Sequence, residues 1–291
     1  MTKRLLFSPA LALAAFLGAQ SPAEQPAPQP GTPPAVAQAP AKLDKWPALK
    51  STDADRANAM LAQFRKDPSL HAGAADGLVA IGDAVAPLLF QKVTNLADNT
   101  NAQVFGVLDR ILGPQHAALL ARMAKHKVTE VRRYVLYRLC RFRDADMLPV
   151  LQAATKDNDS EVAFQAALGL VALGRREGLD ALVARSRSDW NGMKKDTEEV
   201  LPLARGAEPG SWLIELMAKA SPVDRAAGLR LMRYLGAKDQ SGSLKAYLDN
   251  EDRTVVKETV NALRCMNGEQ ALENLSVFDG INMAKAWKAK L

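Results

Sequence analysis

Residues 162–174 read VAFQAALGLVALG, an almost wholly apolar stretch that ends in a glycine. Apolar residues recur in it at spacings of three and four, which is typical of a helix that buries a stripe along its length. Two other stretches begin with valine twelve residues before a comparable end, VRRYVLYRLCRF from Val131 and VKETVNALRCMN from Val256. The stretch is therefore one copy of a recurring helical unit.

The ends of these units, called closing positions here, follow one another at nearly constant intervals of 31, 30, 31, 32, 30 and 32 residues. Glycine suits the end of a helix because it has no Cβ to clash where the backbone turns left-handed. Glycine fills every closing position except one, which holds an arginine. The seven positions are Gly82, Gly113, Arg143, Gly174, Gly206, Gly236 and Gly268.

A second amphipathic stretch follows each closing position, for example PQHAALLARMAKH from Pro114 and ADMLPVLQAATK from Ala145. Each unit is thus a helix, a turn and a helix in about 31 residues, and such units bury their apolar faces by stacking on their neighbours. The aromatic content of only 5% argues against an all-β fold. The sequence predicts an all-α protein, a right-handed α-solenoid of about seven helical hairpins.

Several of these features resemble HEAT repeats, and especially the short HEAT-like repeats of phycobilisome lyases. The features are the Val131-Arg132 and Val256-Lys257 pairs, the core AALGLVALG from Ala166, and the closing glycines. The resemblance covers residues 53–278. It implies an armadillo-like α-solenoid that serves as a non-enzymatic scaffold for protein–protein interaction.

The fifth unit departs from this pattern. Its segment KKDTEEVLPLARG, residues 194–206, places Glu198, Glu199 and Pro202 where core alanines and a leucine are expected. Proline interrupts a helix because it lacks an amide donor and clashes with the preceding turn. We expect a kink or an irregular turn between Trp190 and Gly210.

The N-terminus has the pattern of an exported protein. Lys3 and Arg4 precede an apolar run that ends in small residues, which predicts a signal peptide at residues 1–19. Cleavage after Ala19 and after Ala23 both fit, and the alternative is an uncleaved N-terminal anchor. The sequence therefore predicts a periplasmic or secreted protein.

The remaining chain divides into a linker and a repeat domain. Residues 20–50 contain eight prolines, which disfavour a helix and predict a disordered, semi-extended linker. The repeat domain occupies residues 51–291. Its last part, residues 269–291, is expected to cap the final apolar face with Leu272, Leu275, Phe278 and Trp287.

No pattern of catalytic residues or metal ligands occurs in the sequence. The motifs HExxH, GxSxG, GxGxxG, CxxC and the P-loop are absent, and His71, His116 and His126 fall in different predicted helices. The HEAT-like iron hydroxylases carry His-Glu dipeptides, and this chain has none. Cys140 and Cys265 lie four repeats apart, too far for a disulfide, and are expected to be reduced. We expect no cofactor and no metal.

Basic residues gather on the second helix of each hairpin. The seven thirteen-residue windows that end at closing positions hold 14 Lys and Arg against 7 Asp and Glu, whereas the rest of the repeat domain is net negative. In HEAT solenoids the second helices line the concave face, so the resemblance implies a basic groove. The predicted partner-binding residues are Arg132, Arg133, Arg138, Arg141, Arg225, Arg230, Arg233, Lys257 and Arg264.

Two interpretations of these basic residues remain open. They could bind an acidic segment of a protein partner or an anionic polymer of the cell envelope, since a guanidinium group offers two donors to a carboxylate or a phosphate. Some of them, Arg132 above all, could instead form ion pairs with aspartates of neighbouring repeats and hold the stack together, while others lie in solvent. Nucleic acid is a poorer partner because the net charge of +6 is modest. An alternative function is an accessory subunit or lyase-like factor of an enzyme system.

Overall fold

The computed structural model describes residues 41–96 and 99–291, all of which belong to one compact unit. These residues form helices and turns, and no strand occurs among them. The predicted all-α fold is therefore confirmed for the described part of the chain. The predicted signal peptide at residues 1–19 and the linker up to residue 40 lie outside the described residues.

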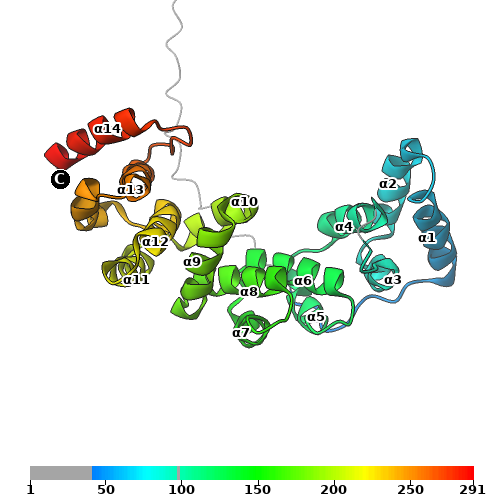
Figure 1. Cartoon of the computed structure of the whole chain (residues 1–291). Helices are drawn as coiled ribbons and strands as arrows, with labels where there is room; N and C mark the ends of the chain where they lie inside the picture. The colour runs from blue at the N-terminus through cyan, green and yellow to red at the C-terminus, as the bar shows by residue number, and fades with distance from the viewer. Residues whose placement is uncertain (1–40, 97–98) are drawn as a thin grey trace, which may run out of the picture. The chain divides into compact units, whose positions relative to one another are not determined.

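Antiparallel helical hairpins follow one another along the chain (Figure 1). The first helices of the hairpins are α1 (Ser51–Gln63), α3 (Ala86–Lys92), α5 (Ala117–Ala121), α7 (Leu148–Ala154), α9 (Leu179–Ser188) and α11 (Ala207–Ala218). The second helices are α2 (His71–Ile81), α4 (Asn99–Ile111), α6 (Thr129–Phe142), α8 (Ser160–Ala172), α10 (Trp190–Val200), α12 (Pro222–Leu235) and α13 (Arg253–Met266).

Segments of 3-10 helix connect these helices, and the longest takes the place of the first helix in the seventh hairpin. In five of these segments, a proline at the first or second position, or an aspartate at or just before the first position, favours a tight turn over a continued α-helix. The segments are η1 (Pro68–Leu70), η2 (Asp83–Val85), η3 (Pro114–His116), η4 (Ala145–Met147), η5 (Arg176–Gly178), η6 (Leu201–Ala204) and η7 (Lys238–Asp249).

The backbone at the closing positions follows the expectation only in part. Gly174 has a φ of 72° directly after α8, and Arg143 adopts the same left-handed region without being glycine. At Gly113 the expectation is wrong: its φ is −124°, because the proline that follows favours an extended backbone. Gly82 and Gly268 are also left-handed, whereas Gly206 and Gly236 are not.

Helix α8 lies at the centre of the apolar core and is buried on almost every side. Val162, Ala166 and Leu170 belong to the core of the earlier hairpins. Leu168 and Val171 belong to the core of the later ones. The nearly continuous apolar sequence of this helix thus reflects contacts with hairpins on both sides.

The fifth hairpin is irregular, as the sequence predicted. Helix α10 ends at Val200, and Pro202 lies in the 3-10 segment η6 that follows. Helix α9 packs directly against α12, and the Ser186 hydroxyl donates to the Ala227 carbonyl at 3.1 Å. The first helix of the fifth hairpin, α9, therefore makes more of the contact with the sixth hairpin than the second helix, α10, does.

Residues 42–49 form an extended strap that contacts the third and fourth hairpins, and Figure 1 shows it in blue ahead of α1. The Leu43 amide donates to the Gln115 carbonyl at 2.9 Å, and Trp46 stacks on His116 at 5.7 Å between ring centroids. Lys42 pairs with Asp144 at 2.7 Å. The linker predicted for residues 20–50 therefore does not reach residue 50, because an extended chain can dock without forming a helix.

The C-terminal segment ends in α14 (Val277–Lys290), which packs on α13 and η7. Trp287 and Ala284 are buried there, as expected of a cap. Phe278 was expected to cover the apolar face as well, but it is 73% exposed because it lies in the first turn of α14 and points to solvent. Leu272 is likewise exposed.

The described helices do not have the length and apolar character of a membrane span. No single helix among them is long and apolar enough to cross a bilayer. The helical segments Pro68–Ile81 and Asp83–Lys92 reach that length and apolar character only when taken together, and they are bent by 104° relative to each other. Their apolar side chains, among them Leu78 and Phe90, are buried in the core of the earlier hairpins.

Candidate functional site

The basic residues predicted on α6 form ion pairs with the next hairpin. Arg132 donates through Nε and Nη2 to both oxygens of Asp157, at 2.9 and 3.0 Å. Arg133 binds both oxygens of Asp159 at 2.9 and 2.6 Å and also reaches Glu130. These hydrogen bonds lower the pKa of both aspartates below the usual value. The two arginines therefore join α6 to the turn that precedes α8.

The other predicted residues of α6 extend these contacts in both directions. Arg138 pairs with Asp109 of α4 at 2.8 Å. Arg141 lies over the Tyr137 ring and binds Asp196 and Glu199 of α10, at 2.6 and 2.9 Å. Ion pairs thus connect the second helices from α4 to α10.

The predicted residues of the last two hairpins are engaged in the same way. Arg230 and Arg233 share Glu258 of α13, and Arg233, only 1% exposed, also reaches Glu273. The remaining three, Arg225, Lys257 and Arg264, donate to backbone carbonyls nearby. Arg264 also forms an ion pair with Glu269.

All nine predicted residues therefore hold a partner within the chain. Six of them bind a carboxylate of another repeat, which agrees with the interpretation in which they bridge neighbouring repeats. The other three hold groups close to them in the chain. The role of all nine in binding a separate partner stays a prediction, and the open basic groove that it requires is largely neutralised by these carboxylates.

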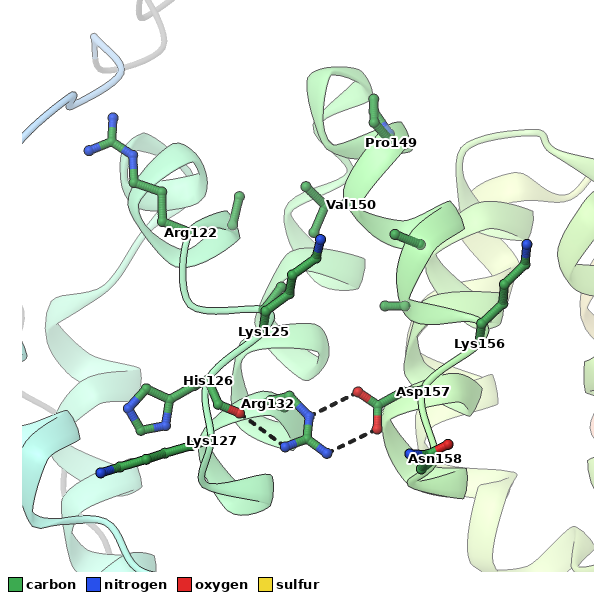
Figure 2. A pocket seen from close by; sticks show the side chains of 14 residues that line it. Arg122, Lys125, His126, Lys127, Arg132, Pro149, Val150, Lys156, Asp157 and Asn158 are labelled. Carbon is green, nitrogen blue, oxygen red and sulfur yellow. Dashed lines mark hydrogen bonds and ion pairs between the residues drawn. The ribbon is translucent and has the colours of Figure 1, made fainter.

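A cleft of about 730 Å³ opens elsewhere, between the ends of α5 and α7 (Figure 2). Its apolar lining comes from Ala121, Ala124, Val150 and Ala154. The cleft exists because α5 and α7 contain only 5 and 7 residues, whereas the adjoining α6 and α8 contain 14 and 13. The lining runs from Pro149 in the first turn of α7 to Asn158 in the turn that follows this helix.

The turns around the cleft are held by hydrogen bonds. Arg132 spans the gap, since it binds Asp157 on one side and donates to the His126 carbonyl at 3.0 Å on the other, as the dashed lines in Figure 2 show. The His126 ring accepts from the Val128 amide at 3.2 Å. The Asp157 carboxylate also accepts from the Asp159 amide. The cleft therefore has a fixed base.

Four cations line the cleft without a hydrogen-bond or ion-pair partner among the described residues. They are Arg122, Lys125, Lys127 and Lys156. Lys125 and Lys156 stand on opposite walls, and their ammonium groups point toward the same side in Figure 2. The only carboxylate of the described lining, Asp157, is already bound by Arg132. The cleft thus combines an apolar lining with unneutralised positive charge.

The charge analysis of the sequence missed these four residues because it counted only the second helices. The available signal was the cluster of basic residues at the ends of the first helices, in ARMAKHK from Ala121 and ATKDN from Ala154. Cations are common at helix C-termini because the helix dipole is negative there. The sequence does not show that two such ends face one cleft.

Comparison with known proteins identifies the repeats around the cleft. A family model of HEAT repeats matches residues 116–201. These residues form HEAT repeats. A solved structure of human deoxyhypusine hydroxylase in complex with glycerol is similar, with 16% identity, a TM-score of 0.32, and coverage of 82% of this chain and 98% of that chain. None of the curated proteins matches the chain.

The HEAT repeats and their flanking hairpins bring no metal-binding cluster together in the described part of the chain. His116 is buried and its Nε2 lies 3.0 Å from Asp83, whereas His126 lines the cleft and His71 packs against Phe64. The three histidines therefore do not converge.

The two cysteines are both free in the structure. Cys140 is buried among the residues between α6 and α8, and burial raises the pKa of its thiol to about 12. Cys265 is half-buried near the end of α13, and burial raises its pKa as well. Neither thiol has the low pKa that favours a reactive thiolate.

Proposed function

We propose that this chain is a non-enzymatic scaffold of the cell envelope that binds an acidic segment of a protein partner in the cleft between α5 and α7. HEAT repeats generally mediate protein–protein interaction. The observation that carries the proposal is the contrast between two sets of cations. Most arginines of the second helices bind carboxylates and the others donate to backbone carbonyls, whereas the four cations around the cleft have neither kind of partner among the described residues.

Free and paired cations differ in what a partner gains by binding them. A paired guanidinium must release one carboxylate to accept another, so the exchange contributes little. An unpartnered lysine gains a new charge interaction, and at an exposed site each such pair contributes about 0.2–1 kcal/mol. The apolar lining adds a surface on which the partner can bury a side chain. Because the contacts are electrostatic, affinity is expected to fall as salt rises.

Lys125 and Lys156 are the residues to change, because both are exposed and stand on opposite walls of the cleft. The test variant is Lys125→Glu with Lys156→Glu. The matched control is Lys238→Glu with Lys285→Glu, which makes the same change at two exposed lysines outside the cleft lining. Circular dichroism first establishes that both variants fold like the wild-type chain.

The binding experiment is affinity capture from an envelope fraction, followed by zero-length crosslinking of lysine to carboxylate. We expect the wild-type chain and the control to crosslink an Asp or Glu of one partner through Lys125 or Lys156. The test variant should lose that partner. Equal capture of the partner by the test variant would show that the cleft is not the binding site. If the captured partner is an enzyme whose turnover depends on this chain, the chain is an accessory subunit instead.

The envelope location rests on the sequence pattern of residues 1–19. Cell fractionation of a C-terminally tagged chain tests it, and N-terminal sequencing of the purified protein distinguishes cleavage after Ala19 from cleavage after Ala23. A full-length chain in the cytosolic fraction would contradict this part of the proposal.

A further inference from the structure

The cleft belongs to a longer edge of the molecule, the edge at which first helices end and second helices begin. The Thr129 amide at the start of α6 donates to the Asn95 side chain at 2.8 Å, which places the turn after α3 beside the turn after α5. A smaller cavity of about 210 Å³ is lined by Arg65, Lys92 and Thr100. The described residues of the turns after α1, α3, α5 and α7 are therefore neighbours along one edge. We call this edge the turn edge; it consists of residues 64–67, 92–96, 122–128 and 155–159.

Cations without a described partner continue along the turn edge beyond the cleft. Arg65 follows α1 and Lys92 ends α3, and both are exposed. Together with the cations of the cleft they place at least one such cation after each of the four first helices. The set is Arg65, Lys92, Arg122, Lys125, Lys127 and Lys156.

The described carboxylates near the second half of this edge are already occupied. Asp157 is bound by Arg132, and Asp159 and Glu130 are bound by Arg133. Arg132 and Arg133 thus neutralise these three carboxylates. The cations at the ends of the first helices therefore have no described carboxylate partner. Among the described acidic residues of these turns, Asp67 after α1 is the one that no arginine binds, and it accepts from the Ser69 amide. The described residues of the turn edge consequently carry more positive than negative charge.

The spacing of the hairpins fixes the spacing of a complementary ligand. Packed helices lie about 8–10 Å apart, and an extended polypeptide advances about 3.3 Å per residue. One hairpin therefore corresponds to about three residues of an extended chain. Four first helices are separated by three such steps, which about nine residues span.

We propose that the acidic segment of the partner lies extended along the turn edge, with a carboxylate at about every third residue and one apolar side chain inserted in the cleft. This inference rests on the proposed function and adds the length and pattern of the segment that is recognised. The apolar side chain contacts Val150 and Ala154, while flanking carboxylates reach Lys125 and Lys156.

A polypeptide fits this edge better than a membrane surface does. The cleft is concave with an apolar lining, so a single side chain can enter it and be buried. A planar bilayer would contact the lysines at the rim but leave the apolar lining empty. The shape of the cleft therefore favours a segment with an apolar anchor.

The test uses two fluorescent ten-residue peptides of identical composition and charge, measured by fluorescence anisotropy against the full chain. One peptide carries aspartates at every third position with a leucine between the middle two. The other carries the same aspartates in a continuous block. We expect the spaced peptide to bind about tenfold more tightly, which corresponds to about 1.4 kcal/mol.

Variants of the chain extend the test. Lys92→Glu with Lys156→Glu should weaken the spaced peptide at least tenfold, whereas Lys238→Glu with Lys285→Glu should leave its affinity unchanged. Replacing leucine by serine in the peptide should also weaken binding. Equal affinity for the two peptides would overturn the proposed pattern.

Two further outcomes separate this inference from the proposed function. If neither peptide binds while crosslinking of a protein partner still depends on Lys125 and Lys156, the extended pattern is wrong and the scaffold function stands. If phosphatidylglycerol vesicles bind the chain with the same sensitivity to charge reversal and the peptides do not, the turn edge contacts a membrane and the inference is overturned.

Discussion

Arg132 and Asp157 form a bidentate ion pair across the base of the cleft, with donor–acceptor distances of 2.9 and 3.0 Å. The two residues are 25 positions apart and come from consecutive hairpins. Their side chains are only 16% and 15% exposed. The pair thus fixes the position of one HEAT repeat on the next and closes the cleft from below.

Arg132→Ala should lower the free energy of unfolding by about 1–2 kcal/mol, because it removes two charge-assisted hydrogen bonds between mostly buried side chains. Arg110→Ala is the control, since Arg110 pairs with Asp76 in a single contact between exposed side chains. That change should cost less than about 0.5 kcal/mol. Urea unfolding of both variants measures the difference, and equal losses would contradict a structural role for the Arg132 pair.

Acid should destabilise the protein through the same arginine contacts. The pKa values of Asp157 and Asp159 are lowered in the folded state by hydrogen bonds from Arg132 and Arg133. A lowered pKa stabilises the folded state above the unfolded value of about 3.9 and stops doing so as the pH falls through the folded pKa.

We therefore expect the urea midpoint to fall steeply below about pH 4 in the wild-type chain. The fall should be shallower in the double variant Arg132→Ala with Arg133→Ala, because it removes the arginine hydrogen bonds that are the largest cause of the lowered pKa values of Asp157 and Asp159. Parallel curves for the two proteins would show that other carboxylates dominate acid unfolding.

Gly174→Ala should destabilise the protein by about 1 kcal/mol. The residue has a φ of 72°, which an alanine side chain disfavours, although no atom lies within 4 Å of the position where its Cβ would stand. Gly106→Ala is the matched control in the exposed middle of α4, also without a nearby atom. There alanine should raise stability by about 0.5–1 kcal/mol. Thermal unfolding of the two variants should therefore shift in opposite directions.

Trp46→Ala should show whether the strap of residues 42–49 belongs to the folded unit. The indole stacks on the buried His116 and packs against the core of the earlier hairpins. Loss of the indole should lower the free energy of unfolding by about 1–2 kcal/mol, which is less than for a fully buried aromatic side chain because Trp46 is only half-buried. Lys42→Ala removes the ion pairs of a half-exposed ammonium group and should lower the free energy of unfolding much less than Trp46→Ala does. If both variants unfold like the wild type, the strap is not bound in solution.

Local patterns predicted most of the helices. The apolar spacing in VAFQAALGLVALG and its sister stretches decides which faces must be buried, and this depends only on residues three or four positions apart. Pro202 predicted the break after α10 for an equally local reason, since a missing amide and a steric clash act within one turn. Gly113 shows the limit of such reasoning, because Pro114 overrode the expected left-handed turn.

The candidate site was less accessible from sequence than the helices. Arg141 finds Glu199 at a separation of 58 residues, and nothing in the local pattern of either helix indicates that pairing. The same holds for Lys125 and Lys156, which become parts of one cleft only when α5 and α7 stack. The sequence alone identified basic residues on helices but not which of them keep their charge unneutralised.

The amino-acid sequence by itself determined that this protein consists of repeated helical hairpins, because helix formation and amphipathicity are set by near neighbours in the chain. Only the tertiary structure decided which arginines hold the hairpins together, where the strap docks and which cations line the cleft. Ion pairing depends on the distance between charged groups in space, and stacking brings together side chains from separate repeats.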